Sequence, residues 1–236
     1  MQRLVLVHGS VVSGRPTWAA QKPLAERFEL VVLDRPGFPP NPPVERVDFE
    51  KDAHLVSDLL QRGDHVVGHS YGGVISLLAA AARPGLPASL TVIEPPATSV
   101  ALDDPDVATF AARGAALYAS GRSDDPDAFL RRFLTAVGSS FDPPSPLTPE
   151  LEQGARALMV ERGPWEASIP LATLAAADFP KLVVSGAHHP AFDAICDALE
   201  RELPAERLVL PGFGHTVQLH PEFNAALVDF VERASA

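Results

Sequence analysis

The stretch that decides the fold is GHSYG at positions 68–72, a G-x-S-x-G pattern between an apolar run at 65–67 and a small-residue stretch at 73–82. The run predicts a buried strand and the small-residue stretch predicts a helix, so Ser70 lies where a strand turns sharply into a helix. Glycines two positions before and after the serine let the backbone fold tightly, which exposes the hydroxyl. Ser70 is therefore the candidate nucleophile. Because glycine and serine are common in turns, the other parts have to come from the flanking sequence.

Two further apolar runs lead into loops that contain candidate functional residues. The run at 4–7 ends in the turn His8-Gly9-Ser10, and the run at 208–210 leads to His215 on a glycine-containing loop. Together with Trp18, the DRPGF stretch at 34–38 and the serine turn, these motifs resemble the α/β-hydrolase superfamily over essentially the whole chain. The resemblance implies that Ser70 is the nucleophile and His215 the general base.

A catalytic serine and histidine also need an acid, since a carboxylate must hold the imidazole in the correct tautomer and stabilise its charged form. In most of the superfamily this acid follows the penultimate strand in a Gly-x-x-Asp pattern. Here that stretch is Gly186-Ala187-His188-His189, which places a histidine at the acid position.

Glu94 is the first choice for the missing acid. It lies at the carboxyl end of the strand that follows the helix after Ser70, the edge where the other parts gather, and some family members carry their acid at this strand. Asp193 is the second choice, although an Asp in the first turn of a helix has an ordinary explanation in the helix dipole. Three other acids are remote alternatives: Asp34, Asp178 and Asp197.

Alternating apolar runs and helical patterns predict the α/β class, with a mostly parallel sheet of about six strands flanked by helices. The resemblance implies that this is the α/β-hydrolase fold. We expect strands near 3–8, 29–33, 64–68, 90–94, 181–186 and 206–210. We expect helices near 16–27, 49–62, 72–82, 191–203 and 221–234. These elements form a core of residues 1–97 and 179–236.

The sheet pattern is interrupted at residues 98–178, where Ala-rich helical stretches at 107–120, 128–137 and 150–162 alternate with Pro-rich connections. An insertion at this point resembles the helical cap that covers the active site in many α/β-hydrolases. Its apolar side chains either line a substrate pocket or hold the insertion together. The candidates are Phe110, Tyr118, Phe129, Phe133, Met159 and Trp165. With Val11, we expect Phe110, Phe133 and Trp165 to contact substrate.

Composition agrees with an ordinary enzyme and disfavours several other classes. The chain has 236 residues, of which 46% are hydrophobic and 21% charged, enough for a sizeable core. The net charge of −11 disfavours nucleic acid as a partner. Cys196 is the only cysteine, so no internal disulfide forms. No basic stretch is followed by a long apolar run, so we expect neither a signal peptide nor a membrane span. We expect no membrane association and a cytoplasmic location.

The oxyanion of a tetrahedral intermediate needs backbone donors, which we expect from Tyr71 and from the turn after His8-Gly9, at Ser10 or Val11. We expect no metal, because adjacent histidines such as His188-His189 rarely converge on one ion, and no cofactor. The sequence thus predicts a serine hydrolase that cleaves a small or medium ester, lactone or thioester. The alternatives are a ligand-binding protein with at most one turnover, or another triad-dependent reaction such as carbon–carbon hydrolysis or lyase chemistry. Nothing in the sequence indicates an oligomeric state.

Overall fold

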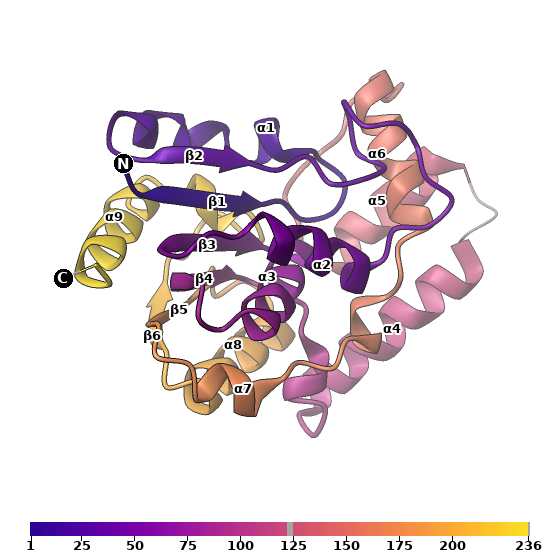
Figure 1. Ribbon diagram of the computed structural model, residues 1–236. Coiled ribbons are helices and arrows are strands. Elements are labelled where there is room, and N and C mark those ends of the chain that lie inside the picture. Colours follow the sequence, from indigo (N-terminus) through magenta and orange to yellow (C-terminus); the bar gives the residue numbers. More distant parts are fainter. Residues whose placement is uncertain (122–124, 236) are drawn as a thin grey trace.

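The computed structural model describes residues 1–121 and 125–235. In these residues, six strands form one sheet in the order β2-β1-β3-β4-β5-β6, and every neighbouring pair is parallel (Figure 1). The strands are β1 (Arg3–Val7), β2 (Glu29–Val32), β3 (Asp64–His69), β4 (Pro87–Ile93), β5 (Lys181–Ser185) and β6 (Glu206–Val209). The predicted α/β class with about six strands is confirmed.

The strand order places a topological switch between β1 and β3. The connection after β1 leads to β2 on one side of β1. The chain then returns to β3 on the other side of β1 and continues outward to β6, so the connections after β1 and after β3 run in opposite directions along the sheet. In a parallel sheet, the crevice outside the carboxyl ends of two such strands is the usual place for a ligand. The residues directly after these two ends are His8 and Ser70.

Alternate residues of each strand face two separate apolar cores, because successive side chains of a strand point to opposite faces. Val5 and Val7 pack with α2 (Phe49–Leu59), α3 (Tyr71–Ala82) and α8 (Pro190–Glu202). Leu4 and Leu6 pack instead with α9 (Phe223–Arg233) and the 3₁₀ helix η1 (Ala19–Glu26). The four central strands, β1, β3, β4 and β5, are buried on both faces, which explains why they contain continuous apolar runs. The edge strands β2 and β6 are partly exposed.

The prediction of one helix near 16–27 is wrong. The segment instead forms a short α1 (Gly14–Thr17) and then the 3₁₀ helix η1, which contains Pro23. A proline inside an α-helix removes one backbone hydrogen bond and collides with the preceding turn, so the segment adopts the tighter form.

Several helices lie between β4 and β5, in the segment 98–178 that the sequence predicts to be a helical insertion. Its elements are η2 (Thr98–Val100), α4 (Pro105–Gly121), α5 (Pro126–Ala136), α6 (Pro149–Met159), η3 (Pro164–Glu166) and α7 (Leu171–Ala175). Asp125 and Thr148 cap the N-termini of α5 and α6 with their side chains, and a proline follows each of them. Helices α4 to α6 lie on the side toward which the arrows of β1 and β3 point (Figure 1).

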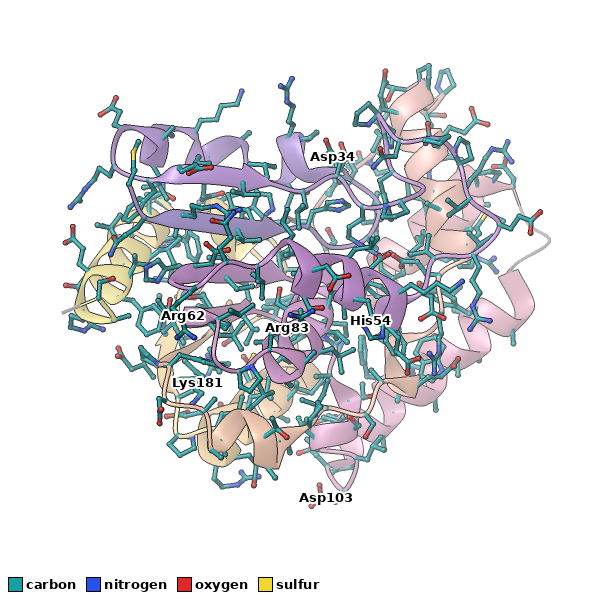
Figure 2. The ribbon with its side chains drawn as sticks, in the orientation of Figure 1. Asp34, His54, Arg62, Arg83, Asp103 and Lys181 are labelled. Carbon is teal, nitrogen blue, oxygen red and sulfur yellow. The ribbon has the colours of Figure 1, made fainter. Side chains whose placement is uncertain are left out.

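Charged side chains lie mainly at the periphery of the molecule. His54 and Arg83 project outward from the helical layer, and Asp103 lies at the tip of a loop (Figure 2). His54 is exposed on the surface of the helix that spans residues 49–59. Within the described parts of the chain, no helix combines the length and apolar character needed to cross a membrane.

Candidate active site

Ser70 lies in the sharp turn that joins β3 to α3. Its backbone has φ 54° and ψ −124°, a conformation that non-glycine residues rarely adopt. The turn is tight: a Cβ atom added to Gly68 would lie 2.3 Å from Ser76 Oγ and 2.4 Å from the Gly72 carbonyl oxygen. The sequence pattern therefore follows from sterics, because only glycine fits at position 68.

Uncommon backbone conformations cluster around this turn. Four non-glycine residues with positive φ follow the ends of four neighbouring strands: Val11 (74°), Ser70 (54°), Glu94 (47°) and Ala187 (50°). Such conformations cost free energy and persist where the surrounding structure holds them, which is common at functional sites. Their clustering at the carboxyl edge of the sheet marks this edge as the candidate site.

The side chains of Ser70, His215 and Glu94 form a continuous chain of hydrogen bonds. Ser70 Oγ lies 2.8 Å from His215 Nε2, and His215 Nδ1 lies 2.9 Å from Glu94 Oε2. The three residues are 8%, 7% and 0% exposed. With the proton on Nδ1, the imidazole donates to Glu94 and accepts from the serine hydroxyl, which is the tautomer that a general base requires.

Glu94 follows the last residue of β4 and is held on both oxygens. Oε1 accepts a hydrogen bond of 2.7 Å from the Gly186 backbone N–H, while Oε2 faces His215. Burial acts to raise the pKa of Glu94, but contacts with His188, His215 and the Gly186 N–H outweigh it and lower the pKa to about 2. The carboxylate is therefore ionised at neutral pH.

Asp193, the alternative acid, has another partner. It lies in the first turn of α8, where its Oδ1 accepts a hydrogen bond of 3.1 Å from Ser185 Oγ. The structure thus brings Glu94, and not Asp193, to His215.

His188 contacts the candidate triad although sequence reasoning gave it no role. Its Nδ1 lies 3.2 Å from Glu94 Oε2, and its Nε2 lies 3.2 Å from the Val137 carbonyl oxygen. Burial acts to lower the pKa of His188, but Glu94 and this carbonyl outweigh it and raise the pKa. His189, at the usual acid position, instead caps α8 by accepting from the Ala191 N–H.

Glu94, His188 and His215 also have potential metal-ligand atoms within 4.8 Å of one another. Two histidines and a carboxylate are a common donor set for zinc. The same atoms of Glu94 and His215 make the hydrogen bonds of the candidate triad, and a metal ion there would displace the Nδ1 proton. The absence of a metal stays a prediction.

His69 precedes the candidate nucleophile and supports the histidine. Its Nε2 lies 2.8 Å from the His215 carbonyl oxygen, to which it donates a hydrogen bond. Burial, followed by repulsion from His215, lowers the pKa of His69 to about 3, so the ring is neutral near pH 7. Its place inside the G-x-S-x-G pattern was the only signal in the sequence.

The expected oxyanion donors lie beside Ser70. Ser10 and Tyr71 line the same cavity as Ser70. In residues 1–121 and 125–235, no group accepts a hydrogen bond from the backbone N–H of Ser10, Val11 or Tyr71. These three N–H groups thus have no partner among the described residues, as oxyanion donors require before substrate binds. His8 is structural, since its Nε2 accepts from the Arg35 N–H at 3.0 Å.

Two apolar cavities meet at Ser70. The first has a volume of about 410 Å³ and contains Phe110, Phe133 and Trp165 in its wall; their contact with substrate stays a prediction. The second has a volume of about 420 Å³ and is lined by Val11 and His215. Both cavities share four lining residues, namely Ser10, Ser70, Phe133 and Val137.

Two of the six apolar candidates in the insertion lie elsewhere. Phe129 and Met159 pack in the insertion's own apolar core and line neither of these two cavities. Tyr118 does line the first cavity, where its ring packs edge-on against Trp165 with centroids 5.2 Å apart.

The parallel sheet and the serine at its carboxyl edge define an α/β fold with a candidate nucleophile at the topological switch. A model of the alpha/beta hydrolase family matches residues 4–227, and the chain belongs to this family.

Individual relatives agree with the family. The pimeloyl-(acyl-carrier protein) methyl ester esterase of Methylococcus capsulatus is 31% identical over 168 residues, which cover 71% of this chain and 62% of that protein. Lipase LipV of Mycobacterium tuberculosis is 30% identical over 172 residues, which cover 71% of this chain and 63% of LipV. The chain thus matches less than two thirds of the length of both relatives.

A solved structure shows the same fold at lower identity. A thermophilic esterase from Thermogutta terrifontis matches this chain with a TM-score of 0.73 and 19% identity. The match covers 100% of this chain and 91% of the other.

Proposed function

We propose that the chain is a serine hydrolase that cleaves a small or medium ester, lactone or thioester through an acyl-enzyme intermediate. The observation that carries this proposal is the pair of hydrogen bonds made by His215, 2.8 Å to Ser70 Oγ and 2.9 Å to Glu94 Oε2. A serine hydroxyl becomes a nucleophile at neutral pH when an oriented imidazole takes its proton.

In the first half of the proposed reaction, Ser70 Oγ attacks the carbonyl carbon while its proton passes to His215 Nε2. The resulting imidazolium is stabilised by the ionised Glu94. The negative charge that develops on the carbonyl oxygen is stabilised by the backbone N–H groups of Tyr71 and Ser10. His215 then gives its proton to the leaving oxygen or sulfur as the bond to the carbonyl carbon breaks.

In the second half, a water molecule takes the place of the leaving group. His215 accepts a proton from this water, and the hydroxide attacks the acyl-enzyme carbonyl. Collapse of the second tetrahedral intermediate releases the acid, and His215 returns the proton to Ser70 Oγ. The hydrogen bond from His69 to the His215 carbonyl keeps the histidine loop in place through both halves.

The two cavities favour a substrate with an apolar group on each side of the scissile bond. The leaving group must lie near His215, because this residue protonates it. The second cavity, which His215 lines, therefore suits the alcohol part, and the first cavity suits the acyl part. In this proposal the helical insertion acts as a cap whose Phe110 and Trp165 determine acyl preference.

The relatives favour ester cleavage over other triad-dependent reactions. Both curated relatives are named as ester-cleaving enzymes, an esterase and a lipase, and the solved structure is also named as an esterase. Neither curated relative is named for carbon–carbon hydrolysis or lyase chemistry.

Turnover of p-nitrophenyl esters from acetate to octanoate tests the proposal. We expect steady multiple turnovers that are absent from the Ser70→Ala variant, with the best kcat/KM at an acyl length that fits the first cavity. A burst of one nitrophenol per chain followed by no further release would instead indicate a ligand-binding protein with a single turnover. Equal release by Ser70→Ala would exclude the serine mechanism.

A further inference from the structure

The loop after β1 carries one half of the proposed oxyanion hole and needs external support. Val11 has φ 74°, which is strained for a β-branched residue. Ser10 lines both cavities beside Ser70, so a small displacement of its backbone would move its N–H away from a developing oxyanion. Oxyanion donors are effective only when they are fixed before the reaction begins.

The helical insertion contacts this loop at two consecutive residues. Gly154 of α6 packs so closely on Val11 that an added Cβ atom would lie 1.8 Å from the Val11 carbonyl oxygen. Glu161, two residues after the end of α6, accepts a hydrogen bond of 2.6 Å from Ser10 Oγ. Glu161 is 0% exposed, so this contact is shielded from water.

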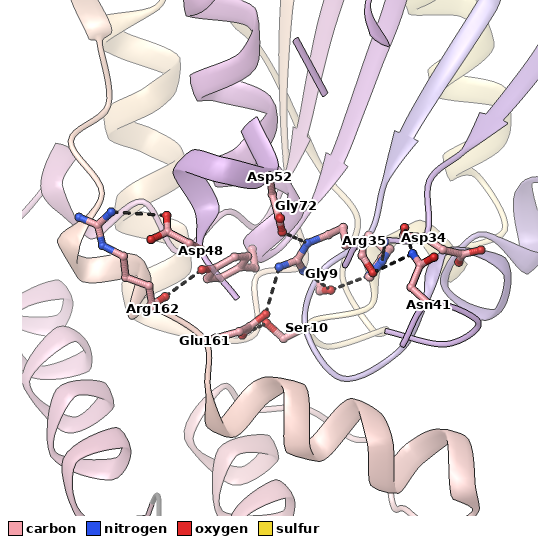
Figure 3. A network of polar contacts seen from close by, with 12 residues as sticks. Gly9, Ser10, Asp34, Arg35, Asn41, Asp48, Asp52, Gly72, Glu161 and Arg162 are labelled. Atoms are coloured by element: carbon pink, nitrogen blue, oxygen red, sulfur yellow. Dashed lines mark hydrogen bonds and ion pairs between the residues drawn. The ribbon is translucent and has the colours of Figure 1, made fainter. Parts of the chain in front are cut away.

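Arg35 connects Glu161 to the core. Its guanidinium donates to Glu161 Oε1 (3.2 Å), Asp52 Oδ2 (2.8 Å) and the Gly9 carbonyl oxygen (2.8 Å), so it lies between Asp52 and Glu161 as Figure 3 shows. The guanidinium carbon also lies 4.7 Å from the centre of the Tyr71 ring. One buried cation thus contacts the residue before Ser10, helix α2 and the insertion.

The residue after Glu161 supports the other half of the proposed oxyanion hole. Tyr71 Oη donates a hydrogen bond of 2.9 Å to the Arg162 carbonyl oxygen. Glu161 and Arg162 are themselves anchored to the core, because the Arg162 N–H donates to the Val47 carbonyl oxygen at 2.8 Å. The side chains of Ser10 and Tyr71, the two expected oxyanion residues, therefore hydrogen-bond to two consecutive residues of the insertion.

We propose that the segment Glu161-Arg162 sets the geometry of the oxyanion hole, with Glu161 as a positioning residue that acts through Ser10. This inference rests on the proposed function. It makes the placement of the insertion a condition for catalysis, because the insertion that shapes the acyl cavity also fixes both oxyanion donors. A carboxylate that only held the insertion on the core would need Arg35 alone and no contact with Ser10.

The charge balance around Glu161 gives the inference a pH signature. The groups that face it are Ser10, Arg35, Asp52 and Tyr71, so two carboxylates share one guanidinium. Burial raises the pKa of Glu161, Arg35 and Ser10 oppose this and Asp52 adds to it, which gives a pKa of about 7. A proton on Oε2 would donate to Ser10 Oγ and reverse this hydrogen bond. The bond would then lack the carboxylate charge and hold Ser10 more weakly.

The test compares Glu161→Gln, Ser10→Ala and the double variant. Glu152→Gln is the matched control, since Glu152 lies on α6 but is exposed and pairs with the nearby Arg156. The first readout is kcat and KM for a p-nitrophenyl ester. The second is the rate at which a p-nitrophenyl phosphonate modifies Ser70, because the phosphoryl oxygen occupies the oxyanion hole whatever the natural substrate is.

We expect Glu161→Gln to lower kcat and the phosphonylation rate by about 10- to 100-fold with little change in KM, below the full loss of an oxyanion donor. Ser10→Ala should give a similar loss, and the double variant should lose little more than either single variant, because both act through one contact. The wild-type phosphonylation rate should contain an ionisation near pH 7 that Glu161→Gln removes. Glu152→Gln should match the wild type.

Two results would overturn the inference. Unchanged kcat and phosphonylation in Glu161→Gln, whatever its melting temperature, would reduce Glu161 to a structural residue. Additive losses in the double variant would show that Glu161 does not act through Ser10. A wild-type chain whose Ser70 is modified by the phosphonate but which hydrolyses no ester would contradict the proposed function alone. The phosphonylation rates of the variants relative to the wild type would still decide the inference.

Discussion

Glu94→Gln should nearly abolish turnover, and the reason lies in the two donors that the carboxylate accepts. The Gly186 N–H donates to Oε1 and His215 Nδ1 donates to Oε2. A glutamine has only one acceptor oxygen, so its NH₂ group must face one of these donors. If the oxygen stays on Gly186, the NH₂ faces His215 and forces the proton onto Nε2. In that tautomer the imidazole is unable to accept the proton of Ser70.

The size of the loss follows from the same contacts. The pKa of Glu94 falls from 4.5 to about 2, and at about 1.4 kcal/mol per unit this is about 3 kcal/mol in favour of the ionised carboxylate. Loss of this charge and the wrong tautomer together should lower kcat by about 10⁴-fold, as for other serine triads.

The assay is ester turnover by Glu94→Gln, with Asp193→Asn as the matched control. Asp193 accepts from Ser185 Oγ, a bond that asparagine can keep, so this variant should retain most of its activity. Melting temperatures measured in parallel would separate catalytic loss from unfolding. The reverse ranking would transfer the acid role to Asp193, and two active variants would refute the assignment of either acid.

Three further outcomes follow from the packing and the charges. Trp165→Ala should lower kcat/KM for long acyl chains by about 10-fold more than for acetate, measured across the ester series, because it removes apolar wall of the first cavity that only a long chain contacts. Equal losses on all chains would make Trp165 only a packing residue. Gly154→Ala should lower stability by about 1–3 kcal/mol in denaturant unfolding, because its Cβ would lie 1.8 Å from the Val11 carbonyl oxygen. Gly85→Ala, which has open space around its Cβ, should be neutral, and equal effects of the two would contradict the close contact. Because the folded-state pKa of Glu94 is lowered from 4.5 to about 2, the stability that its ionised form contributes is present above pH 4.5 and is lost as the pH falls toward 2. Over this range the melting temperature of the wild type should fall more steeply than that of Glu94→Gln. Parallel curves of melting temperature against pH would count against the lowered pKa.

The sheet could be predicted from sequence because its four central strands are buried on both faces and therefore contain continuous apolar runs. The turn at Ser70 could also be predicted, since its pattern is local in sequence. Gly68 is required by contacts with Gly72 and Ser76, close to the serine, whereas Gly72 is required by the backbone of Val7 and His8. The helix near 16–27 was wrong because Pro23 favours a 3₁₀ conformation there. Apolar spacing alone does not distinguish the two helix types.

Part of the candidate site could also be predicted from the sequence, because it depends on the predicted strands. Ser70, Glu94 and His215 each follow a strand, and parallel strands bring their carboxyl ends to one edge, so their proximity could be predicted although their roles stay predictions. His188 and Glu161 had no such signal. Glu161 lies in the insertion, 126 positions from Arg35, and only the folded chain shows that the two are paired.

The most direct test of the central proposal is the mass of the intact chain after reaction with a p-nitrophenyl phosphonate, followed by peptide mapping. The proposed mechanism predicts one adduct per chain, located on Ser70, and no adduct on the Ser70→Ala variant. An unmodified wild-type chain, an adduct on another residue, or a Ser70→Ala variant that is labelled equally would contradict Ser70 as the activated nucleophile.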